Sequence, residues 1–220
     1  MQVMSVFCVS ALLGATVRKL FVLGALAAVA ACGSGGVSDG DVQSFAALSA
    51  NYDGLFEEYE VAGPPSCCHI ADRDQTPGQI NYNGIMFFEM NKIVPSVPQS
   101  LFGRSSVTVD MAADTFSGTV TNIVDEEDNA YGGEFSIANA WVQGIFVETF
   151  LTRVSGTVTR PDGMAVTLDN ASLSGQLYDD GTMIAGALAG TAQVGMGDEL
   201  YFQQIVNSGF IVTTTELPGD

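Results

Sequence analysis

Two adjacent cysteines and the only histidine of the chain form its densest group of reactive side chains. Cys67, Cys68 and His69 follow one another in the stretch PPSCCHIADRD. In an oxidising compartment we expect a disulfide between Cys67 and Cys68, which would close a small, strained and easily reduced ring. Free or intermolecular thiols and a soft-metal site are the alternatives. Zinc sites space their cysteines by two to four residues, so we expect no metal here.

Acidic side chains form a second candidate group. The run Asp125-Glu126-Glu127-Asp128 offers the oxygen ligands that calcium prefers, but it lacks the alternating spacing of a calcium loop. We therefore expect a solvated hairpin tip. Glu57, Glu58 and Glu60 are similarly expected to form the solvated face of a helix.

The sequence contains no recognisable catalytic constellation. It has no nucleophile elbow, phosphate loop or dinucleotide fingerprint. A histidine-dependent triad would have to use His69, in a predicted loop. Trp141 and the phenylalanines are expected in the core. We predict that the protein is not an enzyme and carries no cofactor.

Cys32 ends an apolar segment that follows Arg18 and Lys19. A positive end, an apolar middle and small closing residues are typical of a secretory leader, and Leu20 to Ala31 is shorter than the roughly 20 residues of a spanning helix. The stretch Val29-Ala30-Ala31-Cys32 is similar to the lipobox of bacterial lipoproteins, whose cysteine becomes the acylated first residue. An ordinary leader with a chance cysteine is the alternative.

This similarity predicts a lipoprotein signal peptide over residues 1–31 and lipidation, including palmitate, at Cys32. The Gly-Ser-Gly-Gly that follows has the composition of a flexible tether, which we assign to residues 32–38. Several acyl chains on one residue would give stable membrane anchoring.

Charge limits the choice of partners. The 220-residue chain has a net charge of −18, and without residues 1–31 its five remaining basic residues stand against 25 acidic ones, a balance of −20. Such a chain repels nucleic acid and anionic membrane surfaces, so we expect no nucleic-acid partner. The acidity favours solubility, including in salt.

Residues 39–78 are expected to form an N-terminal helix and a loop. Asp39 or Asp41 could cap the helix, and a break near Asp53-Gly54 is conceivable. The helix would present one apolar face to the domain, formed by Phe45, Leu48, Tyr52, Leu55, Phe56 and Tyr59.

From residue 79 to 215 the chain reads as a β domain. Turn signals separate short segments of alternating pattern, and 91–104 is expected to be a loop. The segment 140–160 is long enough to bend, to bulge near Phe150 or to split in two. We predict eight or nine strands, near 79–89, 106–111, 115–124, 131–138, 140–160, 164–178, 182–193 and 205–214.

A five-residue unit recurs in these segments: apolar, any, glycine, any, apolar. It begins at Tyr82, Phe116, Tyr131, Val142, Val154, Leu173 and Ile184. Alternate residues of a strand share a face, so both apolar residues and the glycine should point to the core. Glycine inside a strand marks a bend or a close approach, which a narrow barrel requires. We predict an all-β, up-and-down antiparallel barrel of about eight strands with a short N-terminal helix; a β-sandwich is the alternative.

Several of these segments resemble the barrel of transferrin-binding protein B-like lipoproteins, in its short, single-barrel, solute-binding form. The similar stretches are QINYNGIMFF from Gln79, TFSGTVTNI from Thr115, IANAWVQG from Ile137, RVSGTVT from Arg153 and MIAGALAGTA from Met183. The resemblance implies an eight-stranded barrel on an outer-membrane lipoprotein. It carries over no binding residues, and Asn207-Ser208-Gly209-Phe210-Ile211 departs from the pattern with a polar first residue.

These observations predict a non-enzymatic outer-membrane lipoprotein, anchored through its N-terminal lipid on the surface or the periplasmic face. Its barrel would present loops to an unidentified protein or small-ligand partner. A carrier of a small ligand such as haem, bound in or near the barrel, is one alternative. A structural envelope component is the other. Phe, Leu and Val on the glycine-bearing faces favour a barrel filled by its own side chains.

Overall fold

The structure, a computed structural model, describes residues 43–62, 78–91, 97–110, 113, 115–143, 149–178 and 182–214. These residues form one helix and eight strands. The elements are α1 (Phe45–Ala62), β1 (Gln79–Met90), β2 (Ser100–Asp110), β3 (Thr115–Asp125), β4 (Ala130–Gln143), β5 (Thr149–Thr159), β6 (Met164–Tyr178), β7 (Met183–Met196) and β8 (Glu199–Thr213).

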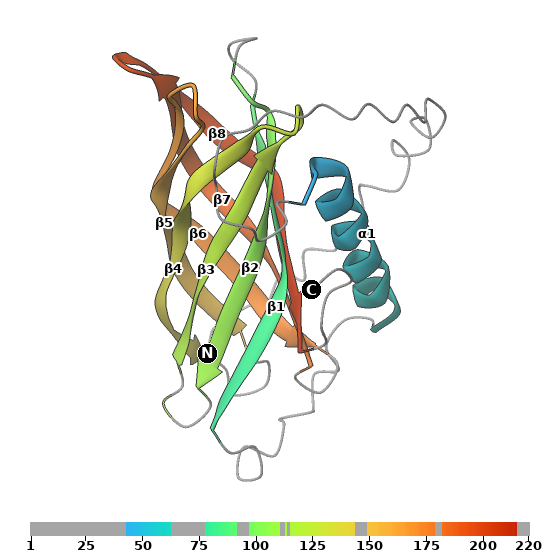
Figure 1. Ribbon diagram of the computed structural model, residues 1–220. Helices are drawn as coiled ribbons and strands as arrows, with labels where there is room; N and C mark the ends of the chain where they lie inside the picture. The colour runs from blue at the N-terminus through green and yellow to red at the C-terminus, as the bar shows by residue number, and fades with distance from the viewer. Residues whose placement is uncertain are drawn as a thin grey trace, which may run out of the picture. The chain divides into compact units, whose positions relative to one another are not determined.

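The strands form one closed barrel in chain order (Figure 1). Every neighbouring pair is antiparallel, and β8 closes the barrel by pairing with β1. The predicted all-β, up-and-down barrel is confirmed. Within the described residues, no helix is both long and apolar enough to cross a membrane.

Three strands differ from the prediction in extent. The segment 140–160 splits, because β4 runs on to Gln143 and pairs with β5 as a hairpin, with Val142 opposite Phe150. The expected loop 91–104 was too long, since β2 already begins at Ser100. β8 begins at Glu199 rather than near 205, because its first residues extend the hairpin with β7. Each of these boundaries is set by hydrogen bonding to the neighbouring strand, which cannot be predicted from the local sequence.

Side chains fill the interior of the barrel. Six of the seven glycine units lie wholly within the described strands, and the apolar residues at both ends of each are buried in the barrel core. Phe116 stacks on Phe150 with ring centroids 4.3 Å apart, and Phe210 meets both rings edge-on. The predicted direction of these units and the predicted filling of the barrel are therefore confirmed.

The backbones of adjacent strands approach closely at the core-facing glycines. A Cβ atom on Gly84 would lie against the carbonyl oxygen of Ile211, far inside van der Waals contact. Gly175 and Gly186 face each other across β6 and β7, and a Cβ on Gly186 would lie 2.5 Å from the Ser174 carbonyl oxygen. Strong coiling of the wall therefore excludes side chains at these points.

The unusual unit in β8 contains a change of register. Asn207 has a φ of 46°, a left-handed conformation that asparagine tolerates better than most residues. The ladders to β1 and β7 both shift register beside it. Beyond this bulge Phe210 and Val212 point into the barrel, while Gly209 and Ile211 point outward toward α1.

Helix α1 lies against the outside of the barrel (Figure 1). Its predicted apolar face is confirmed: Leu48 and Leu55 are buried against outward-facing residues that include Ile85, Phe102 and Ile211. The helix cap differs from the prediction, because the Ser44 hydroxyl accepts the Ala47 N–H at 3.2 Å, whereas Asp39 and Asp41 lie outside the described residues. The helix also continues unbroken through Asp53-Gly54.

Replacing the glycine at the closest strand approach should destabilise the barrel. We expect Gly84→Ala to lower the free energy of unfolding by about 3 kcal/mol, because its methyl group would push β1 away from β8. The matched control is Gly54→Ala, where a Cβ meets nothing within 4 Å and should raise helix stability by up to about 1 kcal/mol. Urea denaturation of both variants measures the difference. Equal stabilities would contradict the close-approach explanation.

Candidate functional site

A groove of about 560 Å³ lies between α1 and the outer wall of the barrel. Three aromatic residues of the helix, Tyr52, Phe56 and Tyr59, form one side. The opposite side and the floor come from β6, β7 and β8, with Phe150 of β5 beneath them. This volume lies within the range of small-ligand sites.

Hydrogen-bonded and stacked side chains build the walls of the groove. The rings of Tyr59 and Tyr178 pack edge to face at 4.9 Å, and their hydroxyl oxygens lie 3.4 Å apart. The Tyr178 hydroxyl also donates to Oε1 of Gln176 at 3.3 Å. Burial, followed by the hydrogen bond with Tyr59, raises the pKa of Tyr178, so this hydroxyl stays neutral at physiological pH.

Glycines make the floor of the groove. Gly175, Gly186 and Gly209 all line it. Gly209 faces the helix, and any Cβ there would collide with the hydroxyl of Tyr52. The bulge at Asn207 thus turns a glycine outward at the point where the helix side chain needs room.

The chemical character of the groove is neutral and partly aromatic. The side chains that line it are aromatic, aliphatic, amide or hydroxyl, with Gln176, Asn207 and Ser174 supplying the polar atoms on the barrel side. The Ser208 hydroxyl is already engaged, donating to the carbonyl of Glu89 or Val206 and accepting the Glu89 N–H at 2.8 Å. Such a site can stack a ring and hydrogen-bond its substituents.

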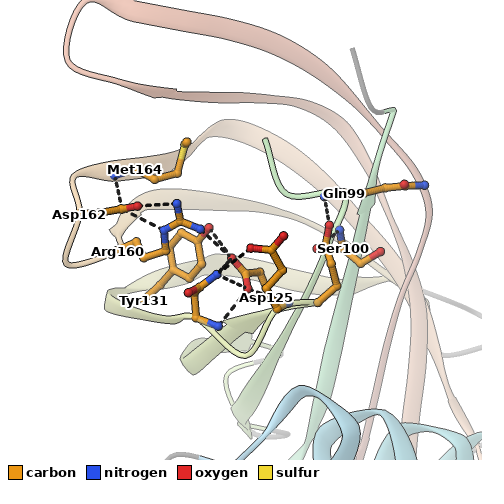
Figure 2. A network of polar contacts seen from close by, with 10 residues as sticks. Gln99, Ser100, Asp125, Tyr131, Arg160, Asp162 and Met164 are labelled. Carbon is orange, nitrogen blue, oxygen red and sulfur yellow. Dashed lines mark hydrogen bonds and ion pairs between the residues drawn. The ribbon is translucent and has the colours of Figure 1, made fainter. Parts of the chain in front are cut away.

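A separate polar network lies at one end of the barrel wall (Figure 2). Asp125 is buried, and its carboxylate accepts hydrogen bonds from the Tyr131 hydroxyl at 3.2 Å and from Arg160 at 3.3 Å. Arg160 also forms a two-point ion pair with Asp162. The hydrogen bond from Arg160 lowers the pKa of Asp162 to about 2. The same hydrogen bond raises the pKa of Arg160.

The expectation of a solvated acidic tip is confirmed for Glu126, Glu127 and Asp128, which are exposed, and corrected for Asp125. Asp125 is buried rather than solvated, because Asn129, Tyr131 and Arg160 satisfy its carboxylate. Glu126 is exposed, yet it accepts the backbone N–H groups of Gln99 and Ser100 and so holds the start of β2.

Asp128 also has a structural contact, accepting the Phe45 N–H at 2.6 Å at the first turn of α1. In the described part of the chain, no group of three or more His, Cys, Asp or Glu side chains is placed to hold a metal ion. The acidic run therefore joins three elements through hydrogen bonds. Glu57, Glu58 and Glu60 are exposed on α1, as predicted.

The predicted cysteine sites lie elsewhere. Cys32, Cys67 and Cys68, with His69, fall outside the described residues, so lipidation and the disulfide stay predictions. Trp141 belongs to β4, but its side chain is not described. Sequence reasoning did not find the groove. Its only sequence signals were the aromatic face of the helix and the irregular unit at Asn207.

Comparison with known proteins identifies no relative: no family model, no curated protein and no solved structure matches the chain.

The network at the barrel end predicts a pH-dependent effect of Tyr131. Burial, then the charge of Asp125, raises the pKa of Tyr131 above its usual value near 10. The raised pKa therefore contributes fully to stability below pH of about 10. This contribution is lost as pH rises further, because Tyr131 ionises in the unfolded chain before it ionises in the folded one.

We expect Tyr131→Phe to cost about 1 kcal/mol near neutral pH, because the buried Asp125 loses a donor. The difference from the wild type should shrink above pH of about 10, where only the wild type loses stability through this group. Denaturant unfolding over a pH series measures both effects. Parallel pH profiles for the two proteins would show that Tyr131 does not titrate in this way.

Proposed function

We propose that this protein is a non-enzymatic lipoprotein of the outer membrane that binds a small, uncharged ligand in the groove between α1 and the barrel. Cys32 would carry the lipid anchor, and residues 32–38 would form the tether. The eight-stranded barrel supports the proposed relationship to transferrin-binding protein B-like lipoproteins, because that resemblance implies the same architecture.

The observation that carries the ligand proposal is the composition of the groove. Aromatic rings from Tyr52, Phe56 and Tyr59 face amide and hydroxyl groups across a space of about 560 Å³. Binding sites for small molecules combine apolar and aromatic walls with a few convergent polar groups in this way. The filled barrel core directs the proposal to the outer wall rather than to the barrel interior.

The absence of charge among the groove residues selects the class of ligand. Haem carries two propionates, and among the described lining residues no lysine or arginine is placed to meet them. Burying a charged group without an opposite charge is costly. We therefore favour a neutral ring with hydrogen-bonding substituents over haem, and binding over catalysis, because the walls offer stacking and hydrogen bonds.

Filling the groove should abolish ligand binding without unfolding the barrel. We expect some members of a library of uncharged aromatic fragments to bind with dissociation constants on the order of 1 mM, measured by ligand-observed NMR. Ser174 is exposed and lines the groove, so Ser174→Trp should fill the groove and remove this binding. The matched control is Ser172→Trp, two residues away on the same face of β6. Equal binding by both variants, or no binding to the wild type, would contradict the proposal.

Lipid anchoring has an independent test in a Gram-negative host. We expect metabolic labelling with a palmitate analogue to mark the chain, and Cys32→Ser to lose the label and leave the membrane fraction. Cys8→Ser is the control and should keep the label, because Cys8 precedes the proposed cleavage site. A label that persists in Cys32→Ser would overturn the anchor while leaving the groove proposal intact.

A further inference from the structure

The helix side of the groove carries a row of aromatic rings. Tyr52, Phe56 and Tyr59 follow one another at steps of four and three residues, which places their side chains on one face of α1. The rings of Tyr52 and Phe56 are inclined by only 19°, with centroids 6.4 Å apart. The ring of Tyr59 follows Phe56 with centroids 5.8 Å apart. This side of the groove is therefore a continuous aromatic surface along the helix.

The barrel side of the groove has small residues with polar groups beside them. Gly186 and Ala187 carry no bulky side chain, so a flat ligand can approach the wall closely there. Ser174, Gln176 and Asn207 supply one hydroxyl and two amides. Hydroxyls and amides can both donate and accept hydrogen bonds. The barrel side therefore suits a ligand that carries donors and acceptors around its rim.

The barrel side is also the side that is open to water. Ser174, Ala187 and Asn207 are exposed, whereas Tyr52 and Phe56 are only partly exposed. A bound ligand would thus rest one face on the rings and keep part of its rim hydrated. A wholly apolar ligand would leave apolar surface in water at this rim and would lose part of the gain from burial. A ligand with one apolar face and a hydroxylated rim avoids this loss.

Charge restricts the ligand to neutral molecules. Among the described residues that line the groove, none is acidic or basic, so an ionised ligand would find no opposite charge. The same helix exposes Glu57, Glu58 and Glu60, and the chain has a net charge of −18. An anionic ligand would therefore also be repelled as it approaches.

We propose that the ligand of this groove is a neutral saccharide, an inference that rests on the proposed function of the groove. A pyranose ring has an apolar face of C–H groups, which can pack on the rings of Phe56 and its neighbours. Its rim of hydroxyls can exchange hydrogen bonds with the amides of Gln176 and Asn207. The row of three rings and the volume of about 560 Å³ exceed the size of one sugar ring, so a short oligosaccharide fits.

A flat aromatic heterocycle is the competing class of ligand. Such rings bind best when they are stacked between two aromatic or apolar side chains. Here the row of rings lies on the helix side alone. The exposed residues of the opposite side, Ser174, Ala187 and Asn207, are small or polar. One-sided stacking with hydrogen bonds at the rim favours the saccharide.

Saturation-transfer NMR of the full chain tests this class of ligand. The sample contains a polyoxyethylene detergent, whose head group carries no sugar. The probes are lactose, maltotriose, cellotriose and chitotriose, with adenosine as the heterocycle. We expect at least one of the four saccharides to bind with a dissociation constant on the order of 1 mM, and to displace the aromatic fragments that bind the groove.

Two variants distinguish contacts at the rim from contacts at the face. Asn207→Gly removes the amide and keeps the left-handed backbone, which glycine adopts readily, so saccharide binding should weaken about fivefold while fragment binding is unchanged. Phe56→Ala should weaken both ligands at least about fivefold, because both stack on this ring. The control is Phe202→Ala, at a residue that is 67% exposed and does not line the groove, and it should bind both ligands as the wild type does.

The outcomes separate this inference from the proposed function. Fragment binding without saccharide binding or displacement would overturn the saccharide and leave the groove as a binding site. Loss of both would overturn both. Adenosine that binds more tightly than all four saccharides, or equal saccharide binding by Asn207→Gly and the wild type, would also contradict the inference. Far-UV circular dichroism establishes folding, and Ser174→Ala replaces Asn207→Gly if that variant does not fold.

Discussion

At Gly84 the backbones of β1 and β8 pass so closely that no side chain fits between them. The same crowding occurs between β6 and β7 at Gly175 and Gly186. A closed eight-stranded barrel has a strongly coiled wall and a narrow interior, which side chains can fill. Phe116, Phe150 and their neighbours occupy that room. Because side chains fill the interior, the groove of about 560 Å³ lies against the outer wall.

Helix α1 converts part of the outer wall into that binding space. The aromatic face of the helix rests on outward-facing residues of the barrel, and its Tyr52 meets Gly209 where the register of β8 has shifted. The groove is therefore a gap left beside a helix–sheet contact. Its walls are neutral because both surfaces carry only aromatic, aliphatic and uncharged polar side chains there. The acidic side chains of the helix, Glu57, Glu58 and Glu60, point away to solvent.

The acidic run from Asp125 to Asp128 stabilises the structure through the polar network at the end of the barrel. Asp125 holds the turn between β3 and β4 and reaches Arg160 after β5, while Glu126 holds the start of β2 and Asp128 the start of α1. In a chain of charge −18, Arg160 is one of only seven basic residues, and it neutralises the buried carboxylate of Asp125. These contacts tie the start of the helix and the start of β2 to one turn, so the position of the helix beside the groove depends on that turn.

The sequence by itself determined the barrel, the filled interior and the apolar face of the helix, because period-two alternation, core-facing glycines and three- to four-residue spacing are local properties of the chain. It did not determine the split of 140–160, the early starts of β2 and β8, or the burial of Asp125, since each depends on pairing with residues distant in sequence. Only the tertiary structure decided that Tyr52, Gln176 and Asn207 line one groove. Strand stagger and the left-handed turn at Asn207 set which outward faces meet the helix, and both are fixed only when the barrel closes.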